Sequence, residues 1–149
     1  MADNYNAIQV LVIEDDEADQ EAVRRNFELR GLPNPLHFAD NGALGLSVLR
    51  KLLRTSTDPC VVLLDWKMPQ MGGLEFLRQL RNDPEIAATV VFVLTSSDDE
   101  KDIIDAYGQH IAGYILKSNV GKAFDNVLRL FDEYFRRVEF PRTHLQAPP

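Results

Sequence analysis

Cysteine is nearly absent from this sequence of 149 residues, and long apolar runs are absent altogether. The single cysteine, Cys60, has no second thiol with which to form an internal disulfide, and it stands just before an apolar run, where we expect a buried structural thiol. No segment approaches the ~20 apolar residues of a membrane span, and the polar start MADNYNAIQ does not resemble a signal peptide. We therefore expect a protein of the reducing cytoplasm.

Basic side chains are outnumbered by acidic ones. The sequence has 16 lysines and arginines against 23 aspartates and glutamates, which gives a formal net charge of −7. A negative surface repels the phosphates of nucleic acids and the headgroups of anionic membranes, so neither is expected as a ligand. The sequence shows no DNA-binding segment. We expect protein partners or small cations.

Five short apolar runs alternate with segments of helical spacing. The runs, which favour parallel strands covered on both faces, span residues 8 to 13, 36 to 39, 61 to 64, 90 to 94 and 114 to 116. Helices are predicted over residues 18 to 30, 42 to 53, 74 to 81, 100 to 107 and 120 to 138. This order predicts one α/β domain, residues 8 to 138, with a doubly wound five-stranded parallel sheet, helices on both faces and an extended C-terminal helix. Residues 1 to 7 and 139 to 149 are predicted tails.

Polar side chains follow four of the predicted strands. Glu14 and Asp15 follow the first strand and Asp65 the third, while Thr95 ends the fourth and Lys117 the fifth. In such a sheet, ligands bind outside the carboxyl ends of the strands. Carboxylates beside a hydroxyl and an ammonium suit a hard cation and a phosphoryl group, because Mg²⁺ prefers oxygen ligands.

Each of these residues also has a simpler explanation when taken alone. The run "EDD" could cap a helix, and Asp16 is predicted to do so. A lysine after a strand is usually solvated, a Thr-Ser pair usually forms a turn, and a tyrosine near a strand usually packs. Four strand ends with complementary groups nevertheless favour a phosphoryl site.

Four motifs occur in order: "VLVIEDDEAD", "LLDWKMPQMGG", "VLTSS" and "GYILKS". In order and spacing they resemble the receiver domain of two-component response regulators, and the resemblance covers residues 8 to 138. It implies a flavodoxin-like, CheY-like, single-domain regulator that is no enzyme beyond its own phosphorylation and dephosphorylation. The phosphoacceptor would be Asp65, and the donor a phosphohistidine of a sensor histidine kinase.

The resemblance implies a role for each matching position around the acceptor. The Mg²⁺ ligands would be Glu14, Asp15, Asp65 and the backbone carbonyl of Lys67. Glu14, being longer than aspartate, is expected to act through a bound water. Lys117 is expected to pair first with the Asp65 carboxylate and then with the acyl phosphate.

A two-state switch is implied at two further positions. Thr95 would form a hydrogen bond at a phosphoryl oxygen, and its inward shift would open space for the ring of Tyr114. Ser96 is small and would leave the pocket open.

The sequence departs from the family pattern after the lysine. Proline commonly follows there, usually with a cis peptide bond, but Ser118 follows Lys117. A cis bond before a residue other than proline costs ~2.5–4 kcal/mol, so the isomer stays open. Lys67 and Ser97 occupy family positions that influence hydrolysis of the acyl phosphate, so its lifetime does not follow by analogy.

The last predicted helix carries a wide apolar stripe, which either packs on the chain's own sheet or forms an association surface. We predict a homodimer through the fourth helix, fifth strand and fifth helix. Its expected contact residues are Tyr107, Ile111, Phe124, Leu128, Phe131 and Phe135.

Two segments, "GLPNPLHFADNGALGLSVL" and "YFRRVEFP", resemble the response regulators of bacterial and cyanobacterial phytochrome histidine kinases. The resemblance implies a phytochrome kinase as partner, with a histidine phosphotransfer protein as a further partner left open and a chemotaxis-type regulator as an alternative. Among other classes, a binding module that works without phosphate would have lost the acceptor or a metal ligand, and neither is lost. A flavodoxin-like cofactor protein would need a phosphate-cradling loop where "EDDEAD" stands, and an aspartate phosphatase a carboxylate where Lys67 stands.

Overall fold

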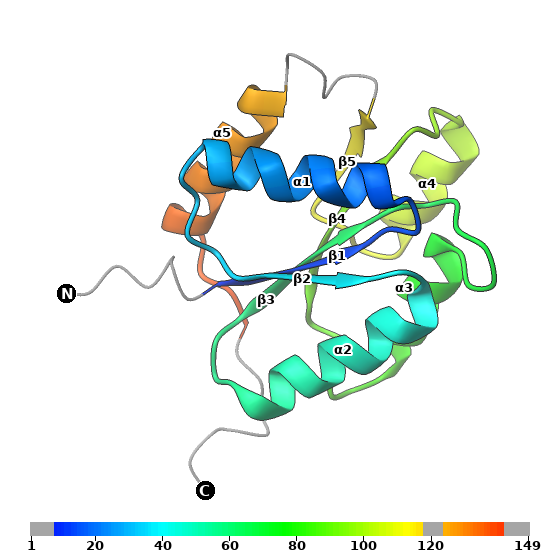
Figure 1. Ribbon diagram of the computed structural model, residues 1–149. Coiled ribbons are helices and arrows are strands. Elements are labelled where there is room, and N and C mark those ends of the chain that lie inside the picture. Colours follow the sequence, from blue (N-terminus) through cyan, green and yellow to red (C-terminus); the bar gives the residue numbers. More distant parts are fainter. Residues whose placement is uncertain (1–7, 118–123, 142–149) are drawn as a thin grey trace, which may run out of the picture.

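The computed structural model describes residues 8–117 and 124–141. Within them, strands and helices alternate along the chain (Figure 1). The strands are β1 (Gln9–Ile13), β2 (Leu36–Ala39), β3 (Cys60–Leu64), β4 (Val90–Thr95) and β5 (Gly113–Leu116). The helices are α1 (Glu17–Leu29), α2 (Gly42–Thr55), α3 (Gly73–Asn82), α4 (Glu100–Gly108) and α5 (Phe124–Arg137). The predicted boundaries agree to within two residues, except at the start of α5, where residues 120 to 123 lie outside the described part.

The strands form one parallel sheet in the order β2-β1-β3-β4-β5. Every residue of β1 and β3 is buried, whereas the edge strands β2 and β5 are mostly half-buried. This difference follows from position, because only inner strands are flanked by strands on both sides and covered on both faces. The predicted α/β fold is confirmed.

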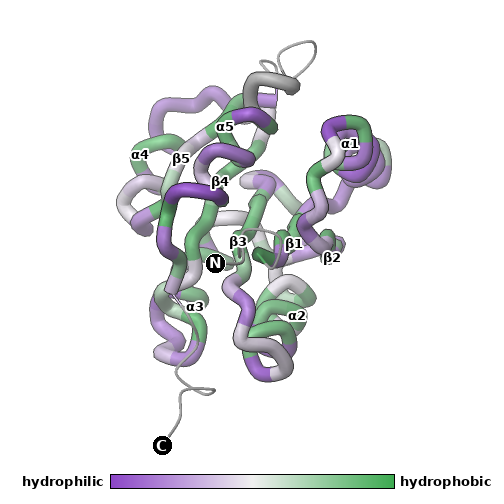
Figure 2. The backbone as a smooth tube through the Cα atoms, turned by 90° about the vertical axis from the view of Figure 1, so that its left-hand side faces the viewer, coloured by the Kyte–Doolittle hydropathy of each residue, from purple (hydrophilic) through white to green (hydrophobic). Residues whose placement is uncertain are grey.

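Helices cover both faces of the sheet, and Figure 2 shows α2 and α3 on one side of the strands and α1 and α5 on the other. Alternate residues of each strand point to opposite faces. Leu11 and Ile13 of β1 therefore join a core with α2, α3 and α4, and Val10 and Val12 join a second core with α1 and α5. Cys60 is buried in the first core, as predicted, and burial raises the pKa of its thiol to about 12.

Short polar side chains begin three of the helices. Asp16 caps α1 by accepting a hydrogen bond from the backbone of Asp19, as predicted. Asn41 caps α2 and Asp99 caps α4 in the same way. Each cap satisfies a backbone N–H that the helix itself leaves without a partner.

The apolar stripe of α5 packs against the chain's own sheet. Three residues of α5 that were predicted to contact a second chain, Leu128, Phe131 and Phe135, are at most 3% exposed, and Ile111 is 8% exposed. The prediction of a contact surface is wrong at these four positions, because their side chains already fill the core and have almost no surface left. Tyr107 is 50% exposed and remains available, while the side chain of Phe124 lies outside the described part.

Aromatic packing continues past the predicted end of the domain at residue 138. The ring of Phe140 lies 5.6 Å from that of Tyr134 and 6.1 Å from that of Phe135, measured between centroids. Phe140 therefore belongs to the packed domain rather than to a tail. Within the residues described, none of the helices has both the length and the apolar character needed to cross a bilayer.

Candidate functional site

The carboxyl edge of the sheet gathers the residues that were predicted to form the site. Glu14 follows β1 and Asp65 follows β3, and these strands are neighbours with Ile13 opposite Leu64. The pairing continues for one more bond, since the Asp65 N–H donates to the carbonyl of Ile13 at 3.0 Å. Parallel register therefore places the two acidic side chains beside each other.

Three carboxylates form a compact cluster at this edge. One oxygen each from Glu14, Asp15 and Asp65 lies within 4.8 Å of the other two. Glu14 is 4% exposed and Asp65 7% exposed, whereas Asp15 is open to solvent. Three hard oxygen donors, one of them reachable from water, suit a divalent cation such as Mg²⁺ that keeps some of its waters.

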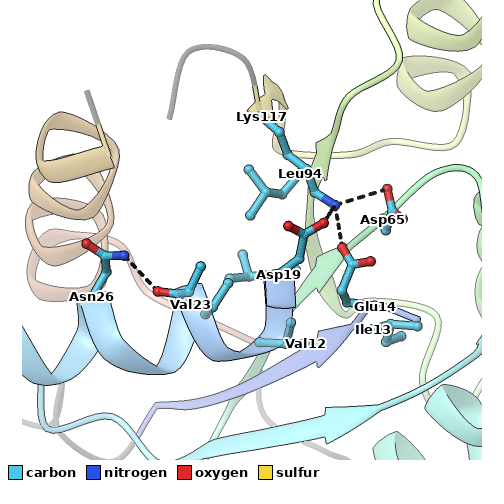
Figure 3. A pocket seen from close by; sticks show the side chains of 11 residues that line it. Val12, Ile13, Glu14, Asp19, Val23, Asn26, Asp65, Leu94 and Lys117 are labelled. Atoms are coloured by element: carbon cyan, nitrogen blue, oxygen red, sulfur yellow. Dashed lines mark hydrogen bonds and ion pairs between the residues drawn. The ribbon is translucent and has the colours of Figure 1, made fainter. Parts of the chain in front are cut away.

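Lys117 reaches into this cluster from the end of β5 (Figure 3). Its Nζ lies 2.5 Å from Glu14 Oε2 and 2.7 Å from Asp19 Oδ2, but 3.8 Å from Asp65 Oδ1. The predicted pairing with Asp65 is thus present as a longer ion pair, and the direct hydrogen bonds go to Glu14 and Asp19. Asp19 was not predicted as part of the site, although it stands within the "EDDEAD" motif and on the first turn of α1.

Burial and charge shift the pKa values of this pair. Burial raises the pKa of the Glu14 carboxyl to about 7, because the hydrogen bond from Lys117 offsets only part of the lost solvation and the Asp65 charge adds to the rise. Burial alone would lower the pKa of Lys117, but hydrogen bonds to Asp19 and Glu14 raise it above its ordinary value. Lys117 therefore stays a cation at neutral pH.

The chain after Asp65 is held close to the acceptor. The backbone N–H of Trp66 donates to Asp65 Oδ1 at 2.9 Å, and the indole ring is buried. Gly73, at the start of α3, donates its N–H to the Trp66 carbonyl at 2.8 Å. A Cβ on Gly73 would lie 2.5 Å from the indole carbon Cε3, so only glycine allows this approach. The ammonium of Lys117 and the backbone N–H of Trp66 together stabilise the negative charge of the buried Asp65 carboxylate.

Thr95 and Tyr114 both contact Ser97, in the loop between β4 and α4. Thr95 is 1% exposed and its Oγ1 accepts a long hydrogen bond of 3.4 Å from the Ser97 N–H. The Tyr114 hydroxyl donates to the Ser97 carbonyl at 2.8 Å, and its ring packs partly buried against the first core. The two predicted switch residues are therefore linked through one short loop, while the switch itself stays a prediction.

Two sequence-based predictions are not tested by the geometry. The side chain of Lys67 points outward, 71% exposed, and the role of its backbone carbonyl as a metal ligand stays a prediction. The peptide bond between Lys117 and Ser118 involves a residue outside the described part, so the prediction about its isomer is not tested.

A cavity of about 290 Å³ opens beside Lys117, lined by α1 and by the sheet (Figure 3).

Comparison with known proteins places this arrangement in a family. The model of the response regulator receiver domain matches residues 10–128. Response regulator Rcp1 of Synechocystis sp. is 28% identical over 145 residues, which cover 95% of this chain and 99% of that protein.

Solved structures of response regulators have the same fold as this chain. The phosphorylated cyanobacterial phytochrome response regulator RcpA superimposes with a TM-score of 0.76 at 25% identity, over 89% of this chain and 97% of the other. The Mn²⁺-bound form of Rcp1 gives 0.74 at 26% identity, over 90% and 98%. The chain therefore belongs to the response regulator receiver domain family and is related to the phytochrome response regulators.

Proposed function

We propose that this chain accepts a phosphoryl group on Asp65 from a sensor histidine kinase and passes the signal on through protein contacts. One observation carries the proposal: a buried carboxylate at the carboxyl edge of the sheet stands beside two further carboxylates and a cationic lysine. Beyond its own phosphorylation and dephosphorylation, we assign it no catalytic activity. Its free buried thiol, Cys60, suits the cytoplasm, where we expect it to act.

The chemistry of the transfer needs few groups. A carboxylate oxygen of Asp65 attacks the phosphorus of the kinase phosphohistidine, the P–N bond breaks, and its electron pair returns to the imidazole nitrogen, which takes up a proton from solvent. The product is an acyl phosphate on Asp65. A carboxylate is ionised at neutral pH, so the attack requires no general base.

Charge repulsion between the carboxylate and the phosphoryl group is the obstacle. A divalent cation bound at Glu14, Asp15 and Asp65 would neutralise part of that repulsion. Metal binding is a property of the family that the three clustered oxygens fit, and a relative, Rcp1, has been solved with Mn²⁺. That the resident ion is Mg²⁺ is our proposal, which rests on its preference for oxygen ligands.

Lys117 holds the second positive charge of the site. Its ammonium lies 3.8 Å from Asp65 Oδ1 while bound to Glu14 and Asp19. A long flexible side chain can exchange these partners for a phosphoryl oxygen without moving the backbone. We assign Thr95 the hydrogen bond to another phosphoryl oxygen, and Tyr114 the rearrangement that follows.

The partner implied by family membership is a sensor kinase, and we propose that it is a phytochrome. The similarity to Rcp1 and to the phytochrome response regulator RcpA supports this choice over a chemotaxis-type regulator. A histidine phosphotransfer protein is a further partner of the same chemistry. Transfer from a phosphorylated phytochrome kinase in preference to a chemotaxis kinase would support the assignment, and the reverse preference would contradict it.

We also propose a homodimer through α4, β5 and α5, with its contacts revised. The core positions Ile111, Leu128, Phe131 and Phe135 are replaced as contact residues by the exposed apolar side chains of α4. Ile104 is 63% exposed and Tyr107 is 50% exposed. Exposed apolar side chains grouped on one helix favour association.

Phosphorylation by acetyl phosphate with and without Mg²⁺, followed by intact mass, tests the proposed acceptor. We expect the wild type to gain one phosphoryl group only with Mg²⁺, and Asp65→Asn to gain none. Asp132→Asn is the matched control, because Asp132 lies on α5 and pairs only with Arg136 among the contacts described. A folded wild type that gains no phosphoryl group would refute the proposal and favour a receiver-fold binding module that works without phosphate.

A further inference from the structure

The carboxylate of Asp102, on the first turn of α4, joins two loops that meet at the site. Its Oδ2 accepts a hydrogen bond from Ser97 Oγ at 2.6 Å, in the loop after β4. Lys67, in the loop after β3, places its Nζ 3.8 Å from the same oxygen. One side chain thus contacts the second residue after Asp65 and the second residue after Thr95.

Ser97 is the point at which this arrangement meets the predicted switch. Its side chain is held by Asp102, its carbonyl by the Tyr114 hydroxyl, and its N–H by Thr95 Oγ1. Of these three contacts, that to Asp102 is short and charge-assisted, whereas that to Thr95 is long at 3.4 Å. Ser97 cannot follow a displacement of Thr95 unless its bond to Asp102 breaks or α4 moves with it.

We propose that Asp102 is a positioning residue that latches the loop after β4 to α4 in the unphosphorylated protein. The proposal rests on the proposed phosphorylation of Asp65 and adds a control of its rate. Asp102 touches none of the reacting atoms and acts through Ser97. Loosening the latch raises the share of molecules in which Thr95 is free to shift, and so speeds phosphorylation.

The ion pair between Asp102 and Lys67 is secondary in this assignment. Lys67 Nζ is 3.8 Å away and its side chain is 71% exposed, so water screens the attraction. The Ser97 hydroxyl is a neutral donor on a half-buried residue, where a lost partner costs more. Substituting Lys67 should therefore matter less to the latch than substituting Ser97.

The decisive variant is Asp102→Asn, with Asp105→Asn as its control. Asp105 lies on the same helix, is similarly half-buried and carries the same charge, but its contact is with Lys101 on its own helix. We expect Asp102→Asn to be phosphorylated by acetyl phosphate about fivefold faster or more than the wild type. Asp105→Asn should behave as the wild type, and equal acceleration in both variants would overturn the proposal in favour of simple charge repulsion.

A double-mutant cycle separates the latch from other effects of the charge. In a Ser97→Ala background the latch is already broken, so Asp102→Asn should accelerate phosphorylation much less than in the wild type. An undiminished acceleration in that background would overturn the proposal. So would unchanged phosphorylation of Asp102→Asn with an intact circular dichroism spectrum.

Amide hydrogen exchange keeps the test independent of phosphorylation. The latch predicts faster exchange at residues 96 to 99 in unphosphorylated Asp102→Asn than in Asp105→Asn. A wild type that accepts no phosphoryl group would refute the proposed function, and exchange would still show whether Asp102 holds the loop. Equal exchange in the two variants would refute the latch itself.

Discussion

At the scale of single residues, the site is governed by what burial does to charge. Asp65 and Glu14 are nearly inaccessible to water, and an ionised carboxylate in such a place requires a cation or donors. The structure supplies Lys117 and the Trp66 N–H to these carboxylates. Burial is the main cause of the raised pKa of Glu14, and the Asp65 charge adds to it, because the hydrogen bond from Lys117 offsets only part of the lost solvation.

The raised pKa of Glu14 predicts a pH dependence of stability in metal-free buffer. Its pKa is about 7 in the folded protein, against 4.5 for an ordinary glutamate side chain. Between these pH values Glu14 binds a proton in the folded state that it does not bind in the unfolded state. The contribution of Glu14 to the free energy of unfolding therefore falls as pH rises from about 4.5 to about 7. When the pH is raised from 5 to 8, we expect the free energy of unfolding, measured by urea denaturation, to fall by about 2 kcal/mol more in the wild type than in Glu14→Gln. Identical pH profiles in a chelator would contradict the raised pKa.

Glycine at the start of α3 is a second residue-scale requirement, and a neighbour provides its control. An added Cβ at Gly73 would meet Trp66 carbons at 2.5 Å and 3.0 Å, whereas at Gly72 the nearest atom is the Trp66 carbonyl oxygen at 3.5 Å. Gly73→Ala should cost ~1–3 kcal/mol of stability and shift the fluorescence of Trp66, the one tryptophan of the sequence. Gly72→Ala should leave that fluorescence unchanged. Equal effects of both variants would speak against this steric account.

At the scale of elements, Arg81 joins the end of α3 to two other segments. Its guanidinium donates to the carbonyls of Ala87 and Thr89, just before β4, and to those of Gln109 and His110, after α4. A planar fork with five donors can serve several acceptors at once, which lysine cannot. Arg81 thus holds the edge opposite to the functional site.

Substitution of Arg81 should therefore destabilise the fold with little effect on phosphorylation. We expect Arg81→Lys to lose about 2 kcal/mol in urea denaturation, because carbonyls that accept from the guanidinium lose their donor. Arg78→Lys, at an exposed position of the same helix, should change stability by less than about 0.5 kcal/mol. A loss at Arg78 as large as that at Arg81 would indicate a general effect of the helix rather than these contacts.

The elements also show which features the sequence could predict. Strands β1 and β3 were predicted because inner parallel strands are continuous apolar runs, and the polar residues after them lie at one edge by topology alone. The ion pair between Lys117 and Asp19 depends on where α1 lies over that edge and on the rotamer of the Lys117 side chain. Neither feature produces a periodic pattern in the sequence. An apolar stripe shows that α5 buries a face but does not show against what, so Phe131 and Phe135 were assigned to the wrong partner.

At the scale of the whole molecule, aromatic packing along α5 and the functional site occupy different parts of the fold. The aromatic rings of Phe92, Phe131, Tyr134, Phe135 and Phe140 pack together along α5. The carboxyl edge holds the site, and α4 presents Ile104 and Tyr107 to solvent next to β5. Because Ser97 links Thr95 to Asp102 of α4, we expect a rearrangement at the site to displace α4.

The α4 surface predicts how association should respond to substitution. If α4 forms the dimer, Ile104→Glu with Tyr107→Glu should give only monomer by light scattering at micromolar concentration, where wild type gives dimer. Leu29→Glu is the control, because Leu29 is 77% exposed but lies on α1. A wild type that stays monomeric, with and without phosphorylation, would contradict the dimer.

The most direct test of the whole assignment is to locate the modified residue in wild-type protein. After reaction with acetyl phosphate and Mg²⁺, the acyl phosphate can be reduced with borohydride, which converts a phosphorylated aspartate to homoserine, and the position read from peptide masses. We predict modification at Asp65 alone, lost when Mg²⁺ is chelated. Modification at another carboxylate, or none in a folded protein, would contradict the assignment.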